Sequence, residues 1–166
     1  GGKNTLALQY GEGPGTGLGY TGDVTLDNSA KSWRVVEYFD WQLTPRFGGQ
    51  FQVVYQKDKR DDGGDQDWWS VGARPVYAFS EQFKLVAEVG HDQIDATDGT
   101  RKLSKFTIAP TFKPQVGGFW QRPEIRAFAS YTDWSSDLNN YGASSFGNEG
   151  FTGGQWSFGV QTEVWF

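Results

Sequence analysis

The stretch QWSFGVQTEVWF, residues 155–166, decides the fold because apolar and polar residues alternate along it without a break. Phe158 and Val160 fall on one face of this stretch, and Ser157 and Gln161 fall on the other. A period of two residues is typical of a β-strand. Because the apolar face continues to the last residue, the pattern favours a membrane β-barrel strand between lipid and a water-filled lumen.

The last residue is aromatic, as is typical of bacterial outer-membrane barrels, whose assembly machinery recognises such an ending. We therefore expect Phe166, Val164 and Phe158, which share the lipid-facing row, to form an assembly signal. The alternative interpretation is an ordinary edge strand of a soluble sheet.

Composition supports a membrane barrel without a membrane-spanning helix. The 166 residues predict one domain covering 1–166, and 17% of them are aromatic, as expected where aromatic girdles mark two membrane interfaces. No apolar run approaches the ~18 residues of a transmembrane helix. The chain has no cysteine, which fits an exported protein, and its net charge of −5 argues against a nucleic-acid partner.

The same alternation recurs along the chain and predicts eight strands. They cover residues 3–10, 32–43, 50–58, 68–79, 83–92, 102–112, 120–134 and 155–166. The connections are expected to alternate between long and short, with 94–100 as one of the long loops and the Gly-rich residues 11–30 as a flexible surface loop. Pro75 predicts a local irregularity. We therefore expect an all-β, antiparallel transmembrane β-barrel with no helix longer than a turn.

Three segments carry a resemblance to a known family. They are DWWSVGARPVYAF (67–79), FWQRPEIRAFASYTDW (119–134) and WSFGVQTEVWF (156–166). In this order and spacing they resemble the maltoporin family of sugar-specific outer-membrane porins, most closely the sucrose porins. The resemblance implies a homotrimer of eighteen-stranded barrels in the bacterial outer membrane. Such porins conduct sucrose or maltodextrins by facilitated diffusion along a lumenal row of aromatic residues.

Eight strands are fewer than eighteen, so the chain resembles the carboxy-terminal part of such a porin. We expect a fragment, a truncated chain or an assembly substrate, and the constriction loop of the family cannot be transferred to it. Eight strands could also close into a small barrel whose interior is filled by side chains. The alternative function is therefore a structural outer-membrane barrel without a channel.

In a strand, odd-numbered and even-numbered residues point to opposite faces, and we call this the strand parity of a residue. Strand parity and the resemblance together indicate which residues bind sugar. The family has aromatic residues of the sugar track at positions matching Trp165 and the region of Trp120 and Phe119, and parity favours Trp120 over Phe119. Tyr38 and Trp68 are weaker candidates, for which a girdle or packing role is preferred.

Parity also places a set of charged side chains in the lumen. They are Arg34, Asp40, Arg74, Lys84, Glu88, Lys105, Arg122, Glu124, Arg126 and Glu163. We expect Arg122, Arg126 and Glu163 to bond sugar hydroxyls because they neighbour the aromatic candidates. A structural ion-pair network on the barrel wall is the equal alternative.

The sequence does not support an enzyme. His91 is the only histidine, expected near a long-loop rim, and no nucleophile elbow or metal-ligand motif is present. A lipid-modifying barrel and a soluble ligand-binding barrel remain alternatives. No cofactor is expected, although the acidic residues within 59–67 could hold calcium without the spacing of an EF-hand.

Overall fold

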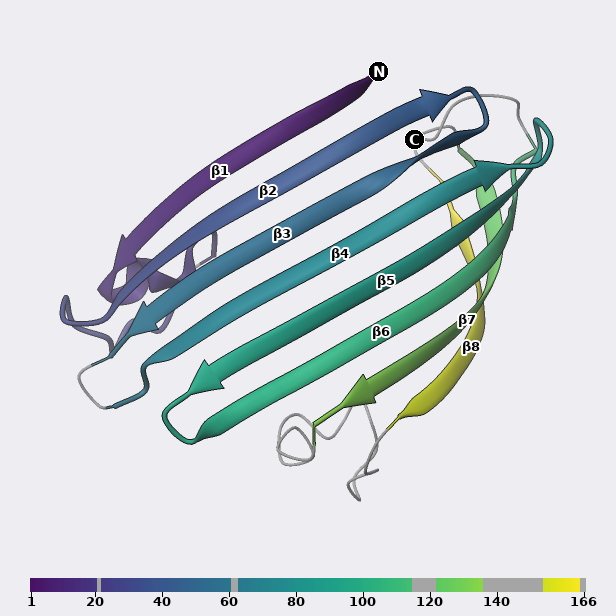
Figure 1. Cartoon of the computed structure of the whole chain (residues 1–166). Helices are drawn as coiled ribbons and strands as arrows, with labels where there is room; N and C mark the ends of the chain where they lie inside the picture. Colours follow the sequence, from purple (N-terminus) through teal and green to yellow (C-terminus); the bar gives the residue numbers. More distant parts are fainter. Residues whose placement is uncertain (21, 61–62, 115–121, 136–153, 165–166) are drawn as a thin grey trace.

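The computed structural model describes residues 1–20, 22–60, 63–114, 122–135 and 154–164, and it consists of one eight-stranded antiparallel sheet (Figure 1). The strands are β1 (Gly2–Glu12), β2 (Lys31–Thr44), β3 (Phe47–Lys59), β4 (Gln66–Ala78), β5 (Phe83–Ala96), β6 (Gly99–Phe112), β7 (Glu124–Trp134) and β8 (Gln155–Glu163). One short 3₁₀ helix, η1 (Gly13–Gly17), follows β1. Within these described ranges, no helix has the length and apolar character needed to cross a membrane.

Each strand pairs with its neighbours in chain order, so β1 and β8 form the two edges of the sheet. The sheet is strongly curved, and β7 and β8 bend round behind the other strands to form a trough (Figure 1). Among the described residues β1 and β8 do not pair, and the sheet is not closed. The expectation of an all-β antiparallel fold is confirmed.

The two faces of the sheet have opposite chemistry. Leu8, Phe158 and Val160 on the convex face are 73%, 74% and 75% exposed. On the concave face Lys84 and Glu124 are buried, although they are charged. A soluble protein buries apolar side chains and exposes charged ones, so this arrangement is inverted and matches a barrel wall with lipid outside and water inside.

The apolar core is correspondingly small. Val76, Val86 and Ala109 form a buried cluster on the concave face, and Phe128 packs against it. A Cβ atom on Gly159 would lie 2.6 Å from the Phe128 ring, so the glycine allows the ring to cross β8. This cluster fixes β4 to β7 beside the polar wall described below.

One of the predicted connections is wrong. Residues 94–100 are not a long loop, because β5 continues to Ala96 and β6 begins at Gly99. Gly99 has a φ of 143°, which a residue with a side chain rarely adopts, and it lets the chain reverse over two residues. The alternation of long and short connections is therefore broken at this position.

The seventh strand begins at Glu124 rather than near residue 120, so Arg122 precedes it. His91 also differs from expectation, since it lies well inside β5 and faces Val71 of β4 rather than a rim. The irregularity expected at Pro75 is confirmed. Pairing between β4 and β5 is interrupted there and resumes in the same register at Val76.

Candidate functional site

A continuous chain of hydrogen bonds crosses the concave face from β2 to β6. The Tyr38 hydroxyl donates to Asp40 Oδ1 at 2.6 Å and accepts from Gln50 Nε2 at 2.5 Å. Arg74 Nη1 contacts Gln50 Oε1 at 3.4 Å, and Arg74 Nε donates to Glu88 Oε2 at 2.8 Å. Lys105 Nζ then reaches Glu88 Oε1 at 3.3 Å. Within each strand these residues alternate with lipid-facing ones, so all their side chains point to the concave face and can reach one another.

A denser group of charges lies on the wall formed by β5, β7 and β8. Glu124 accepts from Lys84 Nζ at 2.6 Å and forms ion pairs with Arg126 at 2.9 Å and Arg122 at 3.4 Å. Glu163 pairs with Arg122 at 3.0 Å and also contacts Arg126. We call these five residues the charged cluster. Because its charges compensate one another in a buried setting, the cluster can fix three strands together.

Nine of the ten predicted lumenal charges lie in strands, at the positions whose side chains point to the concave face, and the tenth, Arg122, precedes β7. Arg122, Arg126 and Glu163, the three predicted to bond sugar, come together in the charged cluster. This contact pattern fits the structural alternative for these residues, and a role in sugar binding stays a prediction. Trp120, Phe119, Trp165 and Phe166 lie outside the described residues.

The remaining residues of the predicted assembly signal lie on the lipid side. Phe158 is 74% exposed and Val164 is exposed as well. Their exposure leaves them accessible to lipid or to another protein, and recognition by the assembly machinery stays a prediction.

The Gly-rich segment after β1 folds against the wall instead of extending as a simple surface loop. Thr16 and Leu18 are buried, and the Leu18 carbonyl accepts hydrogen bonds from Gln9 Nε2 at 3.0 Å and Arg34 Nη2 at 2.7 Å. Parity predicted that Arg34 faces the lumen, but not that it anchors this segment. Residues 13–20 thus occupy part of the concave side at one rim.

The acidic segment 59–67 is described only in part, since Asp61 and Asp62 lie outside the described residues. Asp65 Oδ1 accepts from the Arg60 backbone N–H at 2.7 Å, and Asp67 accepts from Lys57 Nζ at 2.9 Å. In the described part of the chain, no group of three or more acidic or histidine side chains has a geometry suited to a metal ion. Calcium binding in this segment stays an untested expectation.

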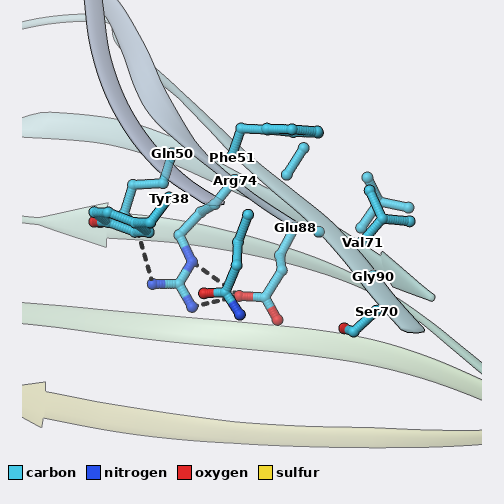
Figure 2. A pocket seen from close by; sticks show the side chains of 12 residues that line it. Tyr38, Gln50, Phe51, Ser70, Val71, Arg74, Glu88 and Gly90 are labelled. Atoms are coloured by element: carbon cyan, nitrogen blue, oxygen red, sulfur yellow. Dashed lines mark hydrogen bonds and ion pairs between the residues drawn. The ribbon is translucent and has the colours of Figure 1, made fainter. Parts of the chain in front are cut away.

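A hollow opens in the concave face beside the hydrogen-bonded chain, between β2 and β5. Its volume is about 290 Å³. Figure 2 shows Tyr38, Gln50 and Arg74 at one end of the hollow, and Ser70 and Gly90 at the other. The sequence supports Tyr38 only weakly as a sugar-binding residue. The hollow beside it forms from the register of neighbouring strands, which no single segment of the sequence shows.

The convex face carries aromatic side chains near both ends of the strands. Near one end the ring pairs are Trp33–Tyr55 and Tyr131–Trp156, with centroids 5.1 and 5.2 Å apart. Near the other end Trp41–Phe47, Tyr77–Phe79 and Phe83–Phe112 are 5.0 to 5.3 Å apart. Two such belts around an apolar band are typical of a membrane β-barrel.

An apolar convex face between two aromatic belts, together with a hydrogen-bonded polar concave face, defines the wall of an outer-membrane channel protein. The model of the family described as LamB porin matches residues 1–166, which is the whole chain. The chain therefore belongs to the LamB porin family.

Membership confirms the resemblance to the maltoporin family and places the protein in the bacterial outer membrane. Members of this family are sugar porins, and they are channels and not enzymes. The concave face with its polar chain is accordingly the lumenal face, and the convex face is the lipid-facing one.

Proposed function

We propose that the protein conducts oligosaccharides of the sucrose or maltodextrin type by facilitated diffusion, with its concave face forming part of the wall of a sugar pore. The hydrogen-bonded chain from Asp40 to Lys105 is the observation that carries this proposal. Sugar hydroxyls need donors and acceptors close together, and this chain offers carboxylate, phenol, amide, guanidinium and ammonium groups along one path.

Aromatic residues supply the second requirement of sugar passage, which is flat apolar surface. On the resemblance to maltoporins, Trp165 and Trp120 or Phe119 provide it. Arg122, Arg126 and Glu163 would then hold the sugar edges as well as each other. Arg126 and Glu163 support this proposal because their side chains keep 16% and 24% of their surface exposed while an ion pair fixes them before a sugar arrives, which limits the entropy lost on binding.

We further propose that these eight strands are part of a larger barrel wall that assembles as a homotrimer with the help of the outer-membrane assembly machinery. The open edges of β1 and β8 support this idea, because unpaired backbone groups in lipid cost several kcal/mol each. Closure of eight strands into a small structural barrel would require β1 to pair with β8. The described residues contain no such pairing.

Sugar titration of the ion current through the pore in planar lipid bilayers tests the proposed function. Sucrose and maltotriose should each reduce the current in a saturable manner, and their half-blocking concentrations rank the two sugars. Mannitol, a polyol without a ring, serves as a control for viscosity. A current that neither sugar reduces more than mannitol does would contradict sugar conduction.

A further inference from the structure

The floor of the hollow is a row of four lumen-facing positions that lie side by side across the sheet. Tyr38 of β2 pairs with Gln52 of β3, Gln52 pairs with Gly72 of β4, and Gly72 pairs with Gly90 of β5. Two adjacent positions of the lumenal wall therefore carry no side chain, and the peptide backbone itself forms the surface.

Neither packing nor backbone strain requires glycine at these two positions. A Cβ atom on Gly72 would meet its nearest neighbour, the Val89 carbonyl oxygen, at 3.6 Å, and one on Gly90 would meet the Val71 oxygen at 3.8 Å. Both are ordinary contacts, and neither glycine has a positive φ. Gly159 differs, because the Phe128 ring covers it. The missing side chains at Gly72 and Gly90 thus leave open space and not a packing contact.

Polar groups without a protein partner face this space. The exposed Gln52 amide and the half-buried Ser70 hydroxyl line the hollow, and within the described ranges neither side chain has a hydrogen-bond partner. At the opposite side the Arg74–Glu88 pair presents a fixed cation and anion 2.5 Å apart. The hollow thus combines a flat floor with free neutral donors and acceptors on one side and a charged pair on the other.

We propose that this hollow is a binding site for one sugar ring. A sugar ring would lie on the backbone of Gly72 and Gly90 and bond Gln52, Ser70 and the Arg74–Glu88 pair through its hydroxyls. The volume of about 290 Å³ is at the lower end of ligand pockets, so it holds one ring and not a whole oligosaccharide. This inference rests on the proposed function and names a site for it.

Sugar block of the pore current tests the site with two variants and one control. Gly72→Val fills the hollow with a side chain suited to a strand and should raise the half-blocking concentration of sucrose about tenfold. Ser70→Ala keeps the shape, removes one hydroxyl and should raise it about fivefold. Ser157→Val also places a valine on the lumenal face, on β8 away from the hollow, and should leave the half-blocking concentration unchanged.

Heat-modifiable gel mobility shows that each variant has assembled, and Ser70→Ala carries the test if Gly72→Val does not assemble. Sucrose block of the parent pore that is unchanged in both hollow variants would overturn this site while leaving sugar conduction intact. A parent pore that no sugar blocks would overturn the proposed function, and this inference with it.

Discussion

The two parts of the lumenal wall use polar side chains in different ways. Between β2 and β5, neutral side chains such as Gln52 and Ser70 surround an open hollow and keep unused hydrogen-bonding groups. On β5, β7 and β8, the charged cluster directs its charges at one another, and the Glu124 side chain is only 2% exposed. An open polar surface can exchange protein contacts for ligand contacts, whereas a buried ion-pair cluster is costly to disturb.

This difference predicts that the largest effect on stability comes from the charged cluster. Glu124→Leu removes the carboxylate shared by Lys84, Arg122 and Arg126 and leaves three cations close together. We expect the free energy of unfolding in detergent to fall by about 3–5 kcal/mol, as is typical when a buried ion pair loses one partner. Urea titration followed by tryptophan fluorescence measures this change.

Glu37→Leu is the matched control, because Glu37 pairs across strands with Leu6 and Val53 on the convex face. Removing a carboxylate from a lipid-facing position should leave stability equal or higher. If Glu124→Leu and Glu37→Leu had the same effect, the charged cluster would not be holding β5, β7 and β8 together.

Breaking the hydrogen-bonded chain should have a smaller effect on stability. Arg74→Ala removes the link between Gln50 and Glu88, but Glu88 keeps its contact with Lys105. We expect a loss of about 1–2 kcal/mol in the same urea titration, together with weaker sugar block. A loss as large as that of Glu124→Leu would show that the open and the closed parts of the wall do not differ in the way described.

The end of the chain offers a comparison between neighbouring residues with different predicted roles. Continuing the alternation of β8, Trp165 should face the lumen and Phe166 the lipid. Trp165→Ala should weaken sugar block by roughly 0.5–1.5 kcal/mol, the scale of aromatic contacts, while assembly is retained. Phe166→Ala should lower the yield of assembled porin and leave sugar affinity unchanged.

Gel mobility and sugar titration of single-channel current score both variants. If Trp165→Ala abolished assembly and left sugar block intact, the two faces would be assigned the wrong way round at the end of the chain.

The smallest predicted effect concerns the Gly-rich segment at the rim. Hydrogen bonds from Thr25 to Asp23, and from Ser29 to Asp27, hold the pKa of each carboxyl below its ordinary value of 3.8. A lowered pKa means that the two turns are stabilised above pH 3.8 and lose this contribution as the pH falls through the folded-state values. Both carboxyls are fully exposed, so the change should be slight.

Amide hydrogen exchange of residues 22–30, compared between pH 5 and pH 3 after correction for intrinsic exchange rates, measures this loosening. Asp23→Asn and Asp27→Asn together should remove the pH dependence. Equal protection at both pH values in the parent protein would contradict the role of these carboxylates.

Most of the sheet could be predicted from the sequence because alternation is a local signal. Phe158 and Val160 are lipid-facing in the structure as their parity predicts, and Arg74, Glu88 and Glu163 are lumenal for the same reason. The tight turn at Thr97–Asp98, which Gly99 follows, was the main local error. An Asp-Gly pair between alternating segments is a strong signal for a tight hairpin, and it could have identified this turn.

The hollow could not be predicted, because it arises only when strands lie in a particular register. Gly72 and Gly90 are 18 positions apart in the sequence, and only the pairing of β4 with β5 makes them neighbours. The docking of the Gly-rich segment depends in the same way on a contact between Arg34 and the distant Leu18 carbonyl. Parity indicates which face a side chain occupies, but not what lies beside it on that face.

The central claim is that the convex face meets lipid and the concave face meets water, and thiol labelling along β8 tests it most directly. The chain contains no cysteine, so single cysteines can be introduced without background. In reconstituted vesicles, a charged water-soluble thiol reagent should react rapidly with Ser157→Cys and Gln161→Cys and slowly with Phe158→Cys and Val160→Cys. Labelling that is uniform along β8, or fast at Phe158→Cys and Val160→Cys, would contradict the account.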